Sequence, residues 1–217
     1  LSVRDLHFPA LPPMTFDIRR GEIAFLRDEN YNTGRRLHEC FLGDRGWTSG
    51  FFRLNGRLYQ PGDLGRVIGS EIGIQIERPD RPGGVLFDNM TALDNLCTSL
   101  IPKAGQHIIR KKIVSSILSE ALRWFPKEML LQPLSSWSYP ERLRFSYYRW
   151  YLLNPKLLIC FFPFAGQESA HHKMIIDLLV LCAQRGMAVW IISSGIDAIC
   201  EKTDNEEFLR RLHYLNK

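Results

Sequence analysis

The sequence contains no apolar run long enough to cross a membrane. The longest apolar run beside a predicted strand covers residues 157–162, far fewer than the roughly 18 residues that a membrane-spanning helix needs. The N-terminus also lacks the positive charges and the apolar core that mark a signal peptide. We therefore expect a soluble chain.

The sequence also lacks paired cysteines. Its five cysteines are widely scattered, none is part of a Cys-x-x-Cys pair, and no histidine lies at metal-site spacing from them. They are Cys40, Cys97, Cys160, Cys182 and Cys200. This scatter predicts reduced thiols in the protein core and no metal site.

Neither charge nor composition sets any part of the chain apart. The net charge of +5 is modest, and the basic residues are interspersed with acids, which permits an acidic partner but does not favour nucleic acid. No internal repeat, low-complexity segment or linker interrupts the 217 residues, and 45% of them are hydrophobic. We therefore expect one domain with its own core. Because the sequence begins without Met, we also expect that it was excised from a longer chain.

The periodicity of the apolar residues predicts an α/β protein. Strands are expected at residues 1–6, 14–18, 22–26, 157–162 and 188–193, and helices at residues 34–42, 91–119, 141–153 and 172–184. The segment TSGFFRLNGRLY predicts a hairpin that turns at Asn55-Gly56. Wholly apolar strands that alternate with a helix towards the C-terminus predict a parallel sheet.

The loop LRDENYNTGRRLHE follows the apolar strand at residues 22–26 and leads into a helix. Set against the phosphate-binding pattern G-x-x-x-x-G-K-[ST], only Gly34 and the cation Arg35 match, while Glu29 replaces the first glycine and Arg36 the hydroxyl. The candidate nucleotide-binding residues are Asn32, Thr33, Gly34, Arg35 and Arg36. On this motif alone, an ordinary strand-to-helix turn, with Gly34 relieving backbone crowding, is the stronger interpretation.

Five stretches raise the weight of that motif because they occur in a familiar order. They are DIRRGEIAFL, TSGFFRLNGR, IGIQIERPDRPGGVLFDNMTALDNL, NPKLLICFFPFAGQESA and RGMAVWIISSGIDAIC. Together they resemble the nucleotide-binding domain of ABC transporters, and most closely the second ATP-binding half of ribose/galactose-type sugar-import ATPases. The resemblance extends to about Asn205. It implies a P-loop ABC ATPase fold with a mostly parallel core sheet, an antiparallel β subdomain and a helical subdomain.

The resemblance also implies where the chemistry of hydrolysis would lie. In the family the fourth stretch ends in an Asp that orients Mg²⁺ and a Glu that polarises the attacking water. Phe161 and Phe162 occupy those positions here. Neither ring can coordinate a hard cation or accept a proton, so we expect no catalytic residue and no bound metal.

Other family positions are also changed. The signature loop corresponds to residues 137–141, where Ser138 matches but Tyr139 and Pro140 replace both glycines and Glu141 opposes phosphate. The resemblance places the phosphate-sensing loop at Glu77, the dimer-interface loop at Glu168 and the switch at Gly195. Arg36 stands where a hydroxyl would ligate Mg²⁺.

These substitutions predict a pseudo-ATPase: a regulatory or interaction domain that needs no cofactor, although ATP or ADP binding without Mg²⁺ stays open. The alternative is a functional ATP-binding subunit, or a degenerate half, of a bacterial sugar importer. We expect a cytoplasmic domain that dimerises with itself or with another nucleotide-binding domain, with a membrane permease as a further partner and the inner face of the membrane as a further location.

Residues 1–90 and 155–200 are expected to form the core with the β subdomain, and residues 91–153 the helical subdomain. For Arg35 and Arg36, the favoured interpretation is a solvated helical turn or ion pairs with Asp28 and Glu29.

Overall fold

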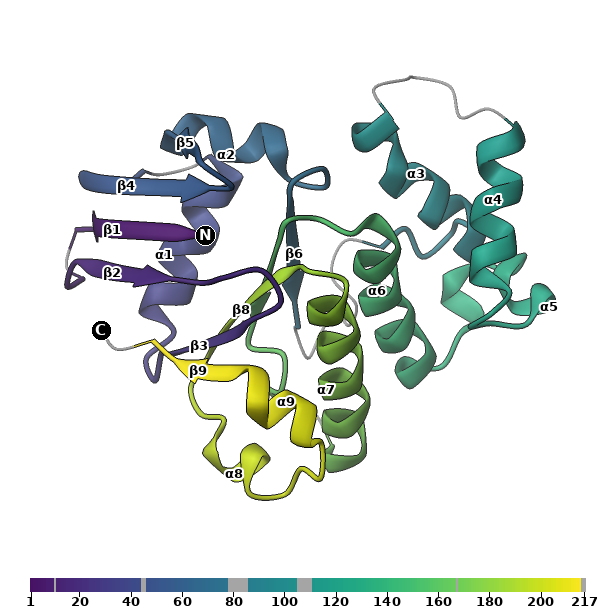
Figure 1. Cartoon of the computed structure of the whole chain (residues 1–217). Helices are drawn as coiled ribbons and strands as arrows, with labels where there is room; N and C mark the ends of the chain where they lie inside the picture. Colours follow the sequence, from purple (N-terminus) through teal and green to yellow (C-terminus); the bar gives the residue numbers. More distant parts are fainter. Residues whose placement is uncertain (10, 44–45, 78–85, 105–110, 167, 216–217) are drawn as a thin grey trace.

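The computed structural model describes residues 1–9, 11–43, 46–77, 86–104, 111–166 and 168–215. Two sheets and a set of helices make up the fold (Figure 1). Within the described residues, no helix is both long and apolar enough to span a bilayer.

A four-stranded antiparallel sheet is built mainly from the first sixty residues. Its strand order is β2-β1-β4-β5. The strands are β1 (Ser2–His7), β2 (Met14–Asp17), β4 (Ser49–Leu54) and β5 (Arg57–Tyr59). The predicted hairpin is confirmed: β4 and β5 pair, and Asn55 and Gly56 both adopt positive φ, at 50° and 82°. An Asn-Gly pair suits this turn because both residues tolerate the left-handed region.

A five-stranded sheet forms the centre of the molecule, with order β6-β7-β8-β3-β9 and all neighbours parallel. The strands are β3 (Ile23–Arg27), β6 (Ile72–Ile76), β7 (Leu157–Phe161), β8 (Ala188–Ser193) and β9 (Leu212–Tyr214). The predicted parallel α/β sheet is therefore confirmed, while β6 and β9 were not predicted as strands. Both faces are covered, which explains why these strands read as continuous apolar runs.

Successive residues of the central strands face two different cores. In β7, Ile159 and Phe161 pack with the antiparallel sheet and α1 (Asn32–Leu42), whereas Leu158 and Cys160 pack with the helices on the other face. The helices on that second face are α6 (Tyr139–Leu153), α7 (Ser169–Gln184) and α9 (Glu206–Arg211). All five cysteines are free, as predicted, but only Cys40, Cys160 and Cys182 are buried, whereas Cys97 and Cys200 are half-buried.

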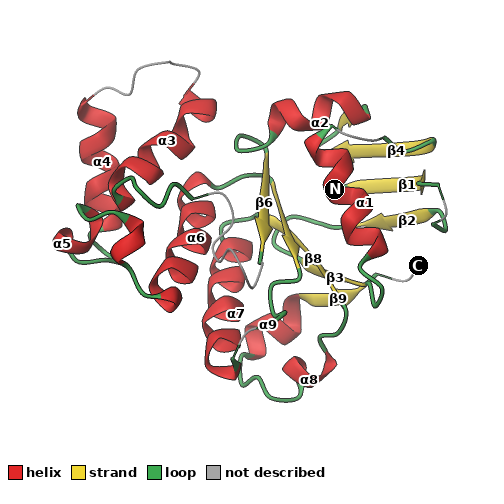
Figure 2. Cartoon of the chain, turned by 180° about the vertical axis from the view of Figure 1, so that it is seen from behind, coloured by secondary structure: helices red, strands yellow, loops and turns green. Residues whose placement is uncertain are grey.

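A separate group of helices extends from the sheet and meets the rest of the fold at α6 (Figure 2). It contains α3 (Ala92–Ala104), α4 (Lys111–Ala121), α5 (Lys127–Leu130) and the 3₁₀ turn Leu134–Ser136. Helix α6 serves both groups, since Tyr147 and Trp150 belong to the core beneath the sheet while Phe145 and Tyr148 belong to the helical core. The two remaining short helices are α2 (Pro61–Val67) and α8 (Asp197–Cys200).

Candidate functional site

The loops that follow β3, β7 and β8 meet at one edge of the central sheet. The register pairs Arg27 with Ser193 and Phe161 with Ile192 at the carboxyl ends of these strands. Backbone hydrogen bonds continue the contact beyond the strands, because the N–H of Asp28 donates to the Ser193 carbonyl at 2.9 Å and that of Phe162 to the Ile192 carbonyl at 2.8 Å. Ligands of open α/β sheets bind at this edge.

The turn between β3 and α1 is closed by a side chain of the chain itself. The Asp28 carboxylate accepts the Thr33 N–H at 3.2 Å through Oδ1 and the Gly34 N–H at 2.7 Å through Oδ2. Asp28 is only 2% exposed, and Tyr31, the residue that precedes α1, has a φ of 57° and makes no side-chain cap. The N–H groups of this turn, which are the phosphate-binding groups of a P-loop, are thus held by an internal carboxylate.

An aromatic ring lies against the same turn. A Cβ atom on Gly34 would lie 2.8 Å from Cζ of Phe162, so the ring packs directly on the glycine. The ring centroid of Phe162 is 4.5 Å from that of Tyr31. Phe161 is buried and makes an edge contact with His38 at 5.7 Å. The side chains at the end of β7 therefore contribute apolar packing to this edge of the sheet and no ligand for a cation.

The two arginines of the turn pair with an acid of their own helix. Arg35 and Arg36 both lie 3.6 Å from the Glu39 carboxylate, one helical turn further on. Of the two interpretations, the solvated turn agrees with Arg35, whose side chain is 58% exposed. The ion pairs with Asp28 and Glu29 are wrong, because Glu29 pairs with Arg27 and Asp28 binds the backbone. The physical reason is helical spacing, which brings residues three and four positions apart onto one face.

Glu77, at the expected phosphate-sensing position, is buried and bonded within the protein. Its carboxylate accepts from Nε2 of Gln75 at 2.6 Å, and the same Gln75 nitrogen lies 3.0 Å from Oγ of Ser146. Trp150 donates its ring N–H to Oε1 of the Gln75 side chain at 2.8 Å. Gln75 therefore joins β6 to α6 through a polar network that also holds the Glu77 carboxylate, and sequence reasoning did not identify this network.

At the expected signature position, Ser138 begins α6 and is bonded to its own helix. Glu141 accepts from both the N–H and the hydroxyl of Ser138, each at 2.7 Å, in a capping-box arrangement. Both bonds lower the pKa of Glu141 from its ordinary value, and the bond from the Ser138 hydroxyl has the larger effect. The first turn of α6 thus carries its own anion.

The two remaining expected positions lie at other helix and strand ends. Glu168 precedes α7 and is exposed, and its carbonyl accepts the His171 N–H at 2.9 Å. Gly195 is exposed in the loop after β8, and a Cβ atom there would meet nothing within 4 Å. The structure thus brings Gly34 and Phe162 into contact, whereas Ser138 and Glu168 bond within their own helical turns.

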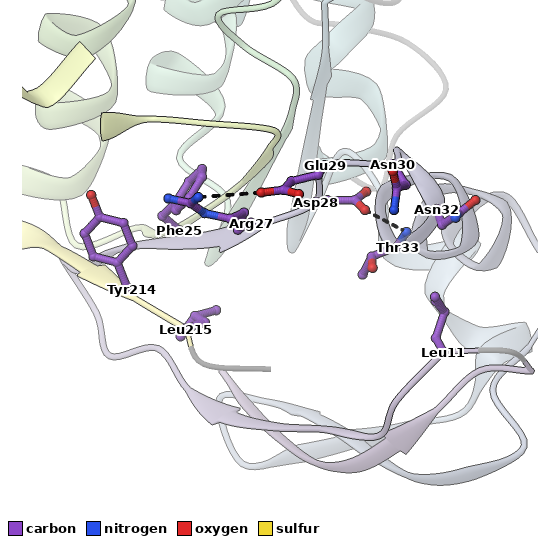
Figure 3. A pocket seen from close by; sticks show the side chains of 10 residues that line it. All are labelled: Leu11, Phe25, Arg27, Asp28, Glu29, Asn30, Asn32, Thr33, Tyr214 and Leu215. Carbon is purple, nitrogen blue, oxygen red and sulfur yellow. Dashed lines mark hydrogen bonds and ion pairs between the residues drawn. The ribbon is translucent and has the colours of Figure 1, made fainter. Parts of the chain in front are cut away.

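A cleft of about 410 Å³ adjoins the Asp28 turn (Figure 3). Its lining side chains belong to Leu11, Phe25, Arg27, Asp28, Glu29, Asn30, Asn32, Thr33, Tyr214 and Leu215. Arg27 is engaged by two acids, Glu29 at 3.6 Å and Asp197, and Asp197 also accepts from the Tyr214 hydroxyl at 3.0 Å. Arg27, the arginine among the described residues that line the cleft, is therefore paired with acids.

The donor set at this edge does not fit a magnesium ion. Magnesium requires carboxylate, hydroxyl or water oxygens, but Phe161, Phe162 and Arg36 occupy the positions where the family would supply them. In the part of the chain that the structure describes, no group of three or more His, Cys, Asp or Glu side chains could hold a metal ion. No step that runs through a metal can be derived from these residues.

Sequence reasoning missed the residue that closes the turn. It considered Asp28 only as an ion-pair partner, because the phosphate-loop pattern directs attention to the residues from Glu29 onward. The one available signal was an Asp just before the N-terminus of a helix, where a carboxylate is stabilised by free N–H groups. Tyr214 was missed because β9 was not predicted.

Comparison with known proteins supports this description of the fold. Among solved structures, cbiO1 from Clostridium perfringens, part of the ABC transporter complex cbiONQ, matches with a TM-score of 0.74 and 20% identity over 99% of this chain and 84% of that one. The dimeric ATP-binding cassette MJ0796 bound to ADP and Pi matches with a TM-score of 0.68 and 16% identity over 99% and 94% of the two chains. These likenesses show the ABC ATPase fold.

Curated relatives are distant but cover most of the chain. A putative ribose/galactose/methyl galactoside import ATP-binding protein of Pseudomonas syringae pv. tomato is 25% identical over 94% of this chain and 39% of its own length. The galactofuranose transporter ATP-binding protein YtfR of Escherichia coli is 24% identical, with 93% and 39% covered. The chain thus spans about two fifths of the length of these relatives. No protein-family model matches it. The chain has the fold of an ABC transporter ATP-binding domain and is distantly related to the ribose/galactose sugar-import ATP-binding proteins.

Proposed function

We propose that the chain is a non-hydrolysing ATP-binding-cassette domain, the degenerate half of a sugar-import-type ABC assembly, and that it acts by association. The observation that carries this proposal is the end of β7, where Phe161 and Phe162 present only aromatic rings. Phosphoryl transfer depends on charge neutralisation by a metal and on a positioned water, and neither ring supplies either.

The partners follow from the same proposal. We expect a dimer with a second copy or with a hydrolysing nucleotide-binding domain, docked on a membrane permease at the cytoplasmic face. Support comes from the solved relatives, since MJ0796 is described as a dimer and cbiO1 as part of a larger transporter complex. The chain matches 39% of the length of a sugar-import ATP-binding protein, which leaves room in such a protein for a second cassette.

A hydrolysing subunit is the second candidate, and the relatives named as import ATP-binding proteins favour it. Several import ATP-binding proteins match at 24–25% identity over at least 88% of this chain. For this candidate to hold, the general base and the magnesium ligands must come from residues other than Phe161 and Phe162, or from a partner's intact site. Mg²⁺-dependent turnover separates the two candidates.

The deciding experiment measures phosphate release from ATP by the purified chain, with Mg²⁺ and with EDTA, beside anisotropy titration of a fluorescent ATP analogue. We expect no Mg²⁺-dependent release above the EDTA control. An Arg35→Ala variant is the matched control, because it shows whether bound nucleotide or turnover depends on the α1 turn. Mg²⁺-dependent turnover that this variant reduces would refute the proposal and favour the hydrolysing subunit.

A further inference from the structure

The Asp28 carboxylate has the position and the bonds of a bound anion. Each of its oxygens accepts one backbone N–H at the start of α1, from Thr33 at 3.2 Å and from Gly34 at 2.7 Å. Asp28 and Thr33 are buried, with exposed fractions of 2% and 3%. The 11-residue α1 directs the positive end of its dipole at this carboxylate.

The carboxylate is held at the end of a rigid strand. Asp28 directly follows β3, and its own N–H donates to the Ser193 carbonyl of the loop after β8 at 2.9 Å. A tethered group competes as an intramolecular ligand, at a high effective concentration, with any anion from solution. Asp28 therefore occupies the turn without requiring a conformational change.

The neighbouring cations do not counteract this arrangement. Arg35 and Arg36 pair with Glu39, and Arg27 pairs with Glu29 and Asp197. A phosphate oxygen and a carboxylate oxygen accept the same N–H groups, so the two are mutually exclusive at Thr33 and Gly34. A phosphate that entered beside an intact Asp28 would meet a buried negative charge and no unpaired arginine among these three.

We propose that Asp28 is an autoinhibitory group, an internal anion that closes the α1 turn against phosphate-bearing ligands. This inference rests on the proposed function, because it describes how a cassette without hydrolytic acids also avoids retaining nucleotide. The excluded class is the tetrahedral oxyanion, either free phosphate or the phosphate chain of a nucleotide.

The test compares Asp28→Ala and Asp28→Asn with the wild-type chain, using inorganic phosphate as the probe and sodium chloride at matched ionic strength as the reference. Binding is followed by the ¹⁵N–¹H shifts of Thr33 and Gly34. We expect Asp28→Ala to bind phosphate with a dissociation constant at least about tenfold lower than that of the wild type, since two backbone N–H donors become available to the anion. Glu29→Gln is the matched control, because it removes a carboxylate from the same cleft but leaves the turn closed.

Amide hydrogen exchange of the wild type tests the contact without any variant. Thr33 and Gly34 are expected to exchange slowly in the wild type, faster in Asp28→Ala, and slowly again when phosphate is added. Rapid exchange of both amides in the folded wild type would overturn the proposal. Saturable phosphate binding by the wild type at these amides, or an equal gain in Glu29→Gln, would also overturn it.

The outcomes for Asp28 and for hydrolysis are separable. The phosphate titration involves no ATP, no Mg²⁺ and no turnover, so its failure leaves the non-hydrolysing domain standing. Conversely, Mg²⁺-dependent hydrolysis by the wild type would refute the proposed function whatever phosphate does in the variants. If Asp28→Ala does not fold, Asp28→Asn supplies the same comparison, because its amide group accepts through only one atom.

Discussion

The N-termini of α1 and α6 are both bonded to a carboxylate, but in two different ways. Each lies where the family resemblance implies a phosphate contact, and each is bonded to a carboxylate of the chain. At α1 the acid is the buried Asp28, which precedes the helix and bonds to two amides inside it. At α6 the acid is Glu141, which lies inside the helix and reaches back to the exposed Ser138.

The two carboxylates differ in how much each is expected to contribute to the free energy of unfolding. A buried anion without its amides, or buried amides without their anion, costs far more than the same loss in water. A capping box at the surface can exchange its bonds with solvent. We therefore expect α1 to depend strongly on its acid and α6 only weakly, and the following variants test that order.

The largest effect is expected from Asp28→Ala. Removing the carboxylate leaves two buried N–H groups without an acceptor, so the free energy of unfolding should fall by about 2 kcal/mol. Urea denaturation at pH 7 measures the loss. Glu29→Ala, at the next position but exposed, should cost less than about 0.5 kcal/mol. Equal losses in the two variants would remove the distinction between the two helix ends.

Gly34→Ala tests the packing of Phe162 on the α1 turn. The new Cβ atom would lie 2.8 Å from the Phe162 ring, so we expect a loss of about 1–2 kcal/mol. In a Phe162→Ala background the contact with the ring disappears and only Oδ2 of Asp28, at 3.2 Å from the new Cβ atom, stays close, so the same change should cost less. A double-mutant cycle in urea measures the coupling. Purely additive losses would show that the ring does not press on this glycine.

Ser138→Ala is expected to have a smaller effect, of about 1 kcal/mol, because it removes the capping hydroxyl of α6 but leaves Glu141 bonded to the Ser138 N–H. Thermal and urea unfolding at pH 7 measure it. Ser194→Ala, at another exposed serine, is the control and should change stability by less than about 0.5 kcal/mol. A loss as large as that of Asp28→Ala would contradict the proposed ranking.

The smallest effect concerns pH. The bonds from Ser138 lower the pKa of Glu141 in the folded state, so this acid stabilises the fold above its unfolded pKa. The contribution is lost as the pH falls through the lower, folded value. Glu141→Gln should therefore be less stable than the wild type by a few tenths of a kcal/mol at pH 7, since the site is exposed to water. The difference in the free energy of unfolding between the two proteins should shrink by pH 3 in urea titrations. A difference that grows in acid would show that folding does not lower the pKa of Glu141.

Much of the fold could be predicted because its signals are local. The Asn55-Gly56 turn and the apolar runs that became β3, β7 and β8 all follow from short sequence patterns. The two strands that were not predicted, β6 and β9, are edge strands of the parallel sheet. The second of them is only three residues long, too short for a periodicity to show.

The candidate site was less predictable than the fold. The identities of Phe161 and Phe162 are visible in the sequence, and so is the absence of acids at the end of that strand. The bonds of Asp28 were not, because a carboxylate before a helix can face solvent, an arginine or the backbone. The contact between the end of β3 and the loop after β8 places the Asp28 carboxylate beside Thr33 and Gly34.

The sequence by itself determined the α/β class and the absence of acidic side chains at the end of β7, since both depend on which residue types follow one another. The tertiary structure alone decided which groups fill this edge of the sheet. Thr33 and Gly34 are buried where the three strand ends meet, so their N–H groups must be bonded within the protein. Asp28, at the end of β3, accepts these N–H groups, and the Phe162 ring packs on Gly34 beside it.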